Sequence, residues 1–179
     1  GYLYTGDLGY MTEEGLLYVK GRFKSLLISS DGEKYRPEGI EEAMVQLAPS
    51  IDQIMLYNNQ SQYTTALIVP NKDYLKRTLS EKGLALNTEE GRIEALKLIN
   101  ADVAMFTKGG AYETMFPHRW LPTCFAVLAE PFSEQNQMIN STMKMVRGKI
   151  EKAYADRIEY MYTPEGKQLL NPRNIEALS

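Results

Sequence analysis

The sequence has little of the chemistry that usually marks a disulfide-linked, metal-bound or histidine-based site. Its 179 residues include one cysteine and one histidine. The single cysteine, Cys124, excludes an internal disulfide framework, makes the reducing cytoplasm the expected compartment, and is most simply a small buried apolar residue. The histidine, His118, lies between prolines in FPHRWLP and is interpreted as a loop or interface residue, because no catalytic partner accompanies it.

Charge of one sign and long apolar runs are scarce as well. The formal net charge is -3, so the chain has no basic footprint, and we expect no nucleic-acid partner. No apolar run approaches the roughly 20 residues that span a bilayer, and the opening GYLYTGDLGY lacks the pattern of a signal peptide. Peripheral contact with the inner membrane surface stays open only for a long-chain acid as substrate, since no basic amphipathic helix requires it.

Familiar catalytic signatures are missing too. The sequence has no phosphate-cradling glycine loop, no cysteine pairs for zinc and no glycine-flanked serine nucleophile, so we predict no metal site in it. The composition, 44% hydrophobic and 24% charged, is that of an ordinary globular domain. Because the chain opens on a motif and not on a methionine, we expect it to be a piece of a longer protein.

The sequence does contain short strands and amphipathic helices. Apolar, β-favouring runs predict two hairpins and one further strand, at 16–20 with 24–30, at 51–58 with 63–70, and at 122–132. Helical spacing with capping residues predicts helices at 38–48, 71–83, 88–110 and 143–162. The pattern therefore predicts an α+β (α/β-like) domain, in which a small β-hairpin precedes a sheet of about three strands flanked by helices.

Three short segments carry charges or turn residues that such a fold does not require. The first, Tyr4-Thr5-Gly6-Asp7, places an aspartate on a tight turn. Capping of the turn is the commoner use of such an aspartate. A carboxylate there is also suited to accept two hydroxyl hydrogen bonds, as from a ribose.

The other two segments are basic. In GRFKSLLISSDGEKYRPEGIEE, Arg22 and Lys24 are two apart on a strand end and point to the same side. They either address a polar ligand or a second domain, or belong to a charged hairpin whose edge resists aggregation. The segment 141–149, STMKMVRGK, is either the basic first turn of a helix, where the dipole disfavours cations, or a connection that presents Lys144 to a phosphate or carboxylate oxygen.

Taken together and in this order, the segments resemble one family. The similar motifs are Y-T-G-D at Tyr4–Asp7, G-R-x-K at Gly21–Lys24, P-E-x-I-E at Pro37–Glu41, E-P-F at Glu130–Phe132 and T-M-K-x-x-R at Thr142–Arg147. The chain resembles the mobile C-terminal domain of the adenylate-forming enzymes, which include acyl-CoA synthetases, luciferases and peptide-synthetase adenylation domains. Within that superfamily it looks most like the long-chain fatty acid–CoA ligases, from residue 1 to about residue 150.

The resemblance implies a reaction in two steps, between which this domain swings from one pose to another. A carboxylate first joins ATP to give an acyl-adenylate and pyrophosphate, and the acyl group then passes to the thiol of coenzyme A. By position in the motifs, Lys144 is the catalytic lysine of the first step. Asp7 holds the ribose hydroxyls, Arg22 supports the same nucleotide, and Lys24 is the hinge about which the domain turns.

For the second step the resemblance implies that the pantetheine arm passes the turn at Gly32, where a glycine lets the backbone approach a ligand. Lys34 and Arg36 are then expected to meet coenzyme A phosphates. The implied co-substrates are ATP with Mg²⁺ and coenzyme A, with the Mg²⁺ ligands in an N-terminal adenylation domain outside this sequence. That domain and a fatty acid are the implied partners, and we expect this chain alone to be inactive.

The resemblance also divides the chain and shows where it departs from the family. Residues 1–21 are expected to end the large domain with the ribose motif and the lead-in to the hinge, 22–162 to form the mobile domain, and 163–179 to be a polar, partly loose tail. Ser25 stands where many members have an acidic residue. The stretch 139–142, INST, lacks the proline usual in the long-chain branch, so we expect a less rigid loop around Lys144.

Two other functions stay open. An adenylating enzyme that loads an acyl carrier protein uses the same reacting group as coenzyme A, so this domain hardly distinguishes the two acceptors. A non-catalytic, partner-binding domain is the second alternative, and it leaves the aligned motifs unexplained. The region 98–122 looks long and has no functional interpretation from the sequence.

Overall fold

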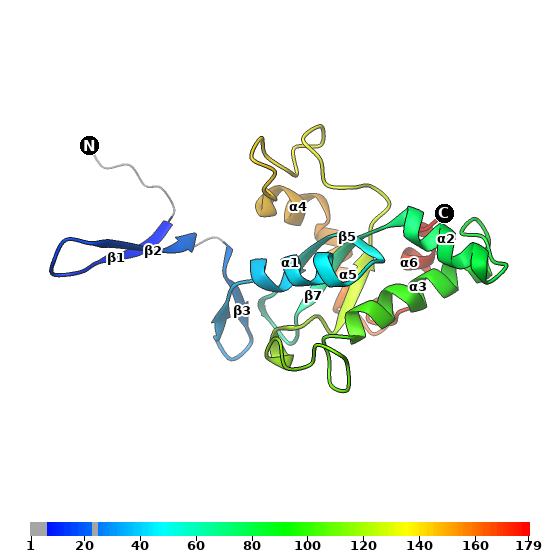
Figure 1. Cartoon of the computed structure of the whole chain (residues 1–179), viewed down its shortest axis with the longest axis horizontal. Helices are drawn as coiled ribbons and strands as arrows, with labels where there is room; N and C mark the ends of the chain where they lie inside the picture. Colours follow the sequence, from blue (N-terminus) through cyan, green and yellow to red (C-terminus); the bar gives the residue numbers. More distant parts are fainter. Residues whose placement is uncertain (1–6, 23–24) are drawn as a thin grey trace.

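The computed structural model describes residues 7–22 and 25–179, with side chains described for 9–18 and 25–179. The first element is a hairpin of β1 (Asp7–Met11) and β2 (Leu17–Arg22), which are antiparallel. Figure 1 shows this hairpin extending away from the rest of the ribbon. A small hairpin does precede the rest of the fold, but its two strands are not the ones predicted to pair.

The predicted partner of β2 is wrong. The structure pairs β2 with β1, and it pairs β3 (Leu27–Ser29) with β4 (Lys34–Tyr35). The turn between β3 and β4 places Gly32 at φ 84°, in the left-handed region that glycine adopts without strain. The Ser29 amide donates to the Glu33 carbonyl over 3.0 Å and closes this turn, so β3 folds back on the chain that follows it.

A third short strand completes this small sheet. β6 (Asn59–Ser61) pairs in parallel with β3, giving the order β4-β3-β6. The sequence predicts this stretch to be the connection within the second hairpin. Its residues are polar and few, so the apolar alternation that predicts a strand is absent.

The central sheet has the order β5-β7-β8 and confirms the predicted sheet of about three strands. β5 (Ile51–Tyr57) and β7 (Thr65–Pro70) are antiparallel, as the second predicted hairpin requires. β8 (Cys124–Val127) lies parallel to β7 and is shorter than the predicted strand.

Both faces of the central sheet are buried. Alternate residues of its strands belong to one apolar cluster, through Ile54, Leu56, Ala66, Ile68, Phe125 and Val127. The residues between them belong to a second cluster, through Met55, Leu67, Val69, Cys124 and Ala126. Since successive strand residues face opposite sides, one short sheet supports two cores, and each fully buried large aliphatic residue contributes about 1.5–3 kcal/mol.

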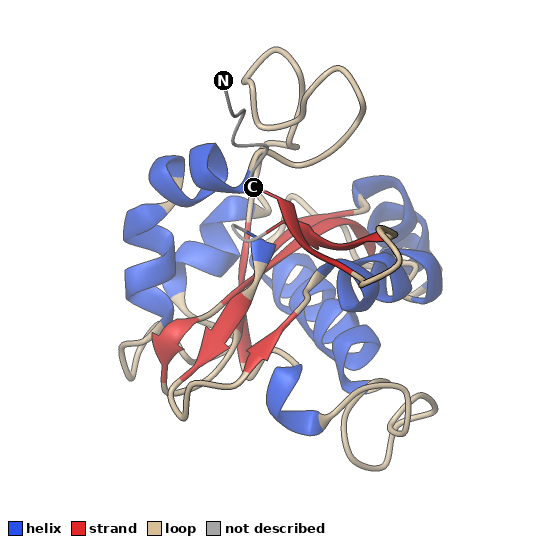
Figure 2. Cartoon of the chain, turned by 90° about the vertical axis from the view of Figure 1, so that its left-hand side faces the viewer, coloured by secondary structure: helices blue, strands red, loops and turns tan. Residues whose placement is uncertain are grey.

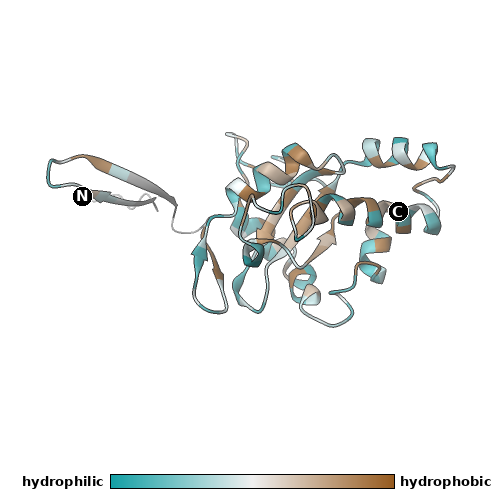
Figure 3. Ribbon diagram, turned by 60° about the horizontal axis from the view of Figure 1, so that its bottom comes forward, coloured by the Kyte–Doolittle hydropathy of each residue, from teal (hydrophilic) through white to brown (hydrophobic). Residues whose placement is uncertain are grey.

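Helices cover the two faces, and Figure 2 shows them on either side of the strands. One face is covered by α1 (Glu38–Leu47), α2 (Lys72–Glu81), α3 (Glu89–Ala104) and α6 (Pro172–Ala177). The other is covered by α4 (Arg147–Ala153) and α5 (Ala155–Met161). Figure 3 shows the apolar segments gathered in this interior, with a further apolar stretch on the β1–β2 hairpin.

The predicted starts of the first three helices are confirmed, and two of them have a side-chain cap. α1 begins directly after Pro37. The Asn71 side chain accepts the Tyr74 amide over 2.9 Å at the start of α2, and the Thr88 hydroxyl accepts the Gly91 amide over 3.1 Å at the start of α3. α3 ends at Ala104, earlier than predicted, and a short 3₁₀ helix, η2 (His118–Trp120), follows before β8.

The single helix predicted at 143–162 is wrong. The structure has two helices, α4 and α5, which are separated at Tyr154, where the backbone leaves the helical region (φ -112°, ψ 24°). Residues 143–146 are not helical, and Met143 has φ 59°. The helical spacing of apolar residues continues across both breaks, which is why the sequence predicts one element.

The partly loose tail predicted at 163–179 is also wrong. α6 packs on the first apolar cluster, and Leu178 is buried. Asn171 caps this helix by accepting the Asn174 amide over 3.0 Å. The polar composition of the segment hides these contacts, because its buried side chains include two asparagines and not only apolar residues. The predicted fold class, α+β with small sheets and flanking helices, is confirmed.

Candidate functional site

Lys144 lies exposed on the connection that leads from β8 to α4, three residues before the helix. An isolated antiparallel bridge joins Ile139 to Met145. The Asn140 amide donates to the Lys144 carbonyl over 2.9 Å, and the Val146 amide donates to the Met138 carbonyl over 2.8 Å. The connection is thus a tight hairpin-like loop, here called the lysine loop (residues 138–146), with Lys144 near its tip.

Arg147, the last residue of the T-M-K-x-x-R motif, forms a buried ion pair with Glu41, the last residue of the P-E-x-I-E motif. Their side chains are 12% and 5% exposed. Glu41 Oε1 also accepts the Leu56 amide over 2.7 Å, and Arg147 Nη1 donates to the Leu56 carbonyl over 3.2 Å. These contacts join α1, β5 and the first residue of α4, directly after the lysine loop.

Burial of Glu41 raises the pKa of its carboxyl, and the charge and hydrogen bonds of Arg147 and the Leu56 amide oppose that rise. Both motifs are visible in the sequence, but nothing in the sequence pairs them. An acidic residue on an otherwise apolar helix face, at the position of a core residue, was the available signal. Its partner could not be identified from spacing alone.

The turn between β3 and β4 contains Gly32, whose missing side chain leaves open space around the backbone. Asp31 orders the turn by accepting the Ser29 hydroxyl and, over 3.1 Å, the Glu33 amide. These hydrogen bonds, that of Ser29 first, lower the pKa of the Asp31 carboxyl. Lys34 is exposed on the same hairpin.

Arg36 directly follows β4 and is also exposed. The structure therefore brings together Gly32, Lys34 and Arg36, the three residues predicted for the coenzyme A path. We call this hairpin, residues 27–36, the glycine hairpin.

The connection from α3 to β8 holds the glycine hairpin. Arg119 in η2 donates from Nε and Nη2 to the Glu33 carboxylate, with 2.6 Å between Nη2 and Oε1. These hydrogen bonds lower the pKa of Glu33. The neighbouring Trp120 ring stacks on the Tyr35 ring, with centroids 5.2 Å apart and planes 5° apart. The region 98–122 had no functional interpretation from the sequence. Near its end, Arg119 and Trp120 contact the glycine hairpin and hold it in place.

The predicted nucleotide-binding residues lie on the other hairpin. The backbones of Asp7 and Arg22 are register partners in the β1–β2 ladder, so the structure brings these two positions together. The predicted hinge, Lys24, lies outside the described residues, as do Tyr4, Thr5 and Gly6.

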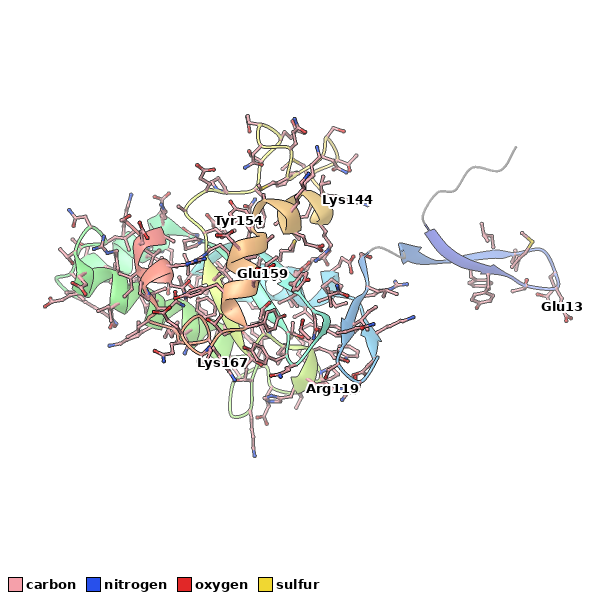
Figure 4. All side chains as sticks on the ribbon, turned by 180° about the vertical axis from the view of Figure 1, so that it is seen from behind. Glu13, Arg119, Lys144, Tyr154, Glu159 and Lys167 are labelled. Atoms are coloured by element: carbon pink, nitrogen blue, oxygen red, sulfur yellow. The ribbon has the colours of Figure 1, made fainter. Side chains whose placement is uncertain are left out.

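Lys144 and the glycine hairpin do not converge on one place. Figure 4 shows Lys144 at the upper end of the domain and Arg119, which holds the glycine hairpin, at its lower end. Figure 1 shows the same separation between the loop preceding α4 and the turn beyond β3. The domain therefore presents its two predicted active groups on different faces.

Cys124 and His118 are not among the predicted site residues, and both lie in regular elements. Cys124 is 7% exposed in β8, and desolvation raises the pKa of its thiol to about 11. His118 begins η2. Within residues 7–22 and 25–179, no cluster of histidine, cysteine, aspartate and glutamate side chains is arranged to hold a metal ion.

Over the same ranges no helix is both long and apolar enough to cross a membrane. A surface hollow of ≈ 430 Å³ lies between α3 and α6, lined by residues such as Glu89, Arg92 and Ile175. It contains none of the predicted site residues, so we do not place the chemistry there.

The fold has known counterparts. The chain superposes on the A-PCP didomain of carboxylic acid reductase from Segniliparus rugosus, solved in complex with AMP, with a TM-score of 0.62 and 21% identity. The match covers 91% of this chain and 21% of that one. The fold is that of the C-terminal domain of adenylate-forming enzymes. No protein-family model matches the chain.

Sequence similarity points to a narrower group. A Mycobacterium tuberculosis protein that carries the name of a fatty-acid–CoA ligase, fadD11, is 32% identical over 171 residues, covering 92% of this chain and 28% of the relative. The long-chain-fatty-acid–CoA ligase ACSBG1 of Mus musculus is 27% identical over 181 residues, covering 90% and 24%. The chain is a homologue of these ligases, as its motifs predict, and it spans about a quarter of their length.

Proposed function

We propose that this chain is the C-terminal domain of an ATP-dependent, AMP-forming fatty acid–CoA ligase. The observation that carries the proposal is the placement of Lys144 and the glycine hairpin on different faces of one domain. A domain that serves two chemical steps in turn needs two such faces. The homology to fatty acid–CoA ligases supplies the reaction, and the AMP bound to the structural relative is consistent with its first step.

In the first step the fatty acid carboxylate attacks the α-phosphorus of ATP. A carboxylate-to-phosphorus bond forms, the bond from that phosphorus to pyrophosphate breaks, and pyrophosphate leaves. Lys144 lies between the carboxylate and the α-phosphate and neutralises the charge that gathers as they meet. Because such catalysis is mostly positioning and electrostatics, removal of the ammonium is expected to cost on the order of 10²–10³ in rate.

In the second step the domain turns about Lys24, and the glycine hairpin faces the acyl-adenylate. The thiolate of coenzyme A attacks the acyl carbonyl, a thioester forms, and AMP leaves with the bonding electrons. The pantetheine arm passes Gly32, where no side chain obstructs it, and Lys34 and Arg36 meet coenzyme A phosphates. Asp7 and Arg22 hold the ribose and the nucleotide from the β1–β2 hairpin.

The remaining parts of the active site belong to an N-terminal adenylation domain. The β1–β2 hairpin exposes a row of large apolar side chains, Tyr10, Met11, Leu16, Leu17 and Tyr18. We assign this row to packing against that domain, because exposed apolar clusters mark interaction surfaces. ATP enters with Mg²⁺, whose protein ligands we place in the same N-terminal domain, so the 179-residue chain alone is proposed to be inactive.

The proposed compartment is the cytoplasm, in keeping with the single buried cysteine. No observation on the described residues supports a membrane contact.

The test compares Lys144→Ala with the wild type in the full-length protein, in the two half-reactions separately. One assay follows acid-dependent ATP–pyrophosphate exchange over a series of acyl lengths, and the other follows thioester formation from preformed acyl-adenylate and coenzyme A. We expect exchange to collapse and thioester formation to be spared, because Lys144 has swung away in the second step. Lys152→Ala, an exposed lysine on α4, is the matched control and should leave both rates unchanged.

Survival of exchange in Lys144→Ala would show that this lysine is only a cation near a helix start. The acyl acceptor has one specific alternative, because the structural relative carries a carrier-protein domain next to its adenylation domain. The second assay therefore also offers an acyl carrier protein in place of coenzyme A. A preference for the carrier protein would replace the coenzyme A ligase with a carrier-loading enzyme, whereas activity with neither acceptor would favour a non-catalytic, partner-binding domain.

A further inference from the structure

We propose that Asn140 is the positioning residue for Lys144: its side-chain oxygen holds the lysine loop in the shape that presents the lysine. This inference rests on the proposed role of Lys144 in adenylation and extends it to a residue that does not touch the substrate. The stretch around Asn140 lacks the proline on which a rigid loop was expected to depend, so another device must order it.

The contacts of Asn140 converge on Lys144. Its Oδ1 accepts the Lys144 amide over 2.9 Å, the Thr142 amide over 3.0 Å and the Thr142 hydroxyl over 2.8 Å. Its own amide donates to the Lys144 carbonyl over 2.9 Å. Both backbone polar groups of Lys144 are thus bonded to one residue, which fixes where its side chain begins.

The tip of the loop depends on this arrangement. Met143 lies between the bonded residues with φ 59° and a side chain that is 75% exposed. A non-glycine residue in the left-handed region is strained and persists only where its surroundings hold it. The Met143 amide donates to the Asn140 carbonyl over 2.9 Å, so the same asparagine also closes the strained turn.

Packing cannot replace these hydrogen bonds. Residues 140–144 are exposed, so burial of apolar surface contributes little to the order of the tip. The far end of the loop has a separate anchor, the Arg147–Glu41 ion pair. Asn140 therefore fixes the near side and Arg147 the far side, and Lys144 is held between the two.

The experiment uses the full-length protein with Asn140→Ala, Asn140→Asp and Lys144→Ala. Aspartate keeps an oxygen that can accept all three hydrogen bonds, because every contact of the Asn140 side chain that orders the tip is one in which it accepts. We expect Asn140→Ala to lower kcat of acid-dependent ATP–pyrophosphate exchange about 10- to 100-fold with little change in KM for ATP, as for a misplaced catalytic group. Asn140→Asp should retain most of the rate.

A matched control lies in the same connection. Asn136 also orders a turn through its Oδ1, which accepts the Ser133 amide over 3.0 Å and the Met138 amide over 3.2 Å, and neither of these hydrogen bonds involves Lys144. Asn136→Ala should leave exchange near the wild-type rate. Thioester formation from preformed acyl-adenylate should be unchanged in all the asparagine variants.

Hydrogen exchange of the Lys144 amide gives a readout that does not depend on activity. This amide loses its acceptor in Asn140→Ala and should exchange faster, whereas in Asn140→Asp it should stay protected. The proposal is overturned if Asn140→Ala keeps the wild-type rate of ATP–pyrophosphate exchange while Lys144→Ala loses it. It is also overturned if Asn140→Asp lowers that rate as much as Asn140→Ala does, or if Asn140→Ala lowers the rates of both half-reactions together. Full activity of Lys144→Ala would overturn the proposed role of Lys144 itself, on which this inference rests.

Discussion

Glu41 and Arg147 are 106 residues apart in the sequence, yet they form a buried ion pair that also binds both backbone polar groups of Leu56. The pair connects α1 to the first residue of α4, directly after the loop that carries Lys144. A carboxylate and a guanidinium are tolerated in this buried position because each neutralises the charge of the other. Both also hydrogen-bond the backbone of the strand between them. The last residues of the P-E-x-I-E and T-M-K-x-x-R motifs therefore form one contact.

Glu41→Ala should destabilise the domain by about 3–5 kcal/mol, because it leaves the Arg147 charge buried and unpaired. Glu42→Ala, an exposed neighbour on the same helix, is the control and should change the free energy of unfolding by less than about 0.5 kcal/mol. Urea denaturation of both variants measures the difference. The double variant Glu41→Leu with Arg147→Met should lose much less unfolding free energy than Glu41→Ala. A loss equal to the sum of those of Glu41→Leu and Arg147→Met measured singly would contradict this account.

Asn174 in α6 should prove essential to the fold of the C-terminal segment. Its fully buried side chain accepts the Val127 amide and an Arg157 Nη2 hydrogen over 3.0 Å each, and donates to the Phe125 and Leu169 carbonyls over 3.2 Å each. Replacement by alanine leaves several of these buried groups without a hydrogen-bond partner and should lower the free energy of unfolding by about 2–4 kcal/mol.

The control for this prediction is Asn100→Ala, an exposed asparagine on α3, which should be close to neutral. Thermal unfolding of the two variants separates them. If Asn174→Ala unfolded at the wild-type temperature, the helix would not be an integral part of the domain.

Cys124 should resist thiol reagents in the folded protein. Its side chain is 7% exposed, and its pKa of about 11 leaves on the order of one thiolate in a thousand at pH about 8. Modification by a chromogenic disulfide reagent should therefore be slow until urea unfolds the chain, when one thiol per chain reacts quickly. Rapid modification without denaturant would show that β8 is open to solvent.

The contact between Glu33 and Arg119 should be pH-dependent. Arg119 lowers the pKa of Glu33 below its ordinary value of 4.5, so the pair stabilises the fold above that value and is lost as the pH falls through the lowered pKa. A double-mutant cycle with Glu33→Gln and Arg119→Gln should give a favourable coupling at pH about 7 that is smaller at pH about 3 and weakens in high salt. A coupling of equal size at both pH values would show that the ion pair does not act through charge.

Local signals in the sequence were sufficient for several elements. Asn71 and Thr88 cap α2 and α3 as predicted, since a cap involves only residues within one turn. The continuous apolar runs of β5 and β7 predict two neighbouring strands, and the short polar stretch between them allows only an antiparallel pair. Of the two interpretations of the segment 141–149, the structure agrees with the connection that carries Lys144 ahead of a helix, and not with the first turn of the helix.

Strand partners were less accessible to sequence reasoning. β2 was assigned to the strand that follows it, but the structure pairs it with β1, and both pairings satisfy the same alternation. The sequence does not predict β6, because three polar residues have no periodic apolar pattern. Partner choice depends on which surfaces the rest of the chain covers, and that information is not local.

The sequence by itself determined the local elements, the motif order and the family resemblance, because caps, turns and apolar periodicity act over a few residues. Only the tertiary structure decided which charges meet. Glu41 with Arg147, and Glu33 with Arg119, are pairs between distant segments, and many other carboxylates and cations in the chain had the same formal chemistry. The packing of helices on both faces of the central sheet brings these particular side chains within hydrogen-bonding distance. Because the Glu41–Arg147 pair is also buried, loss of either partner is expected to lower the stability of the fold strongly.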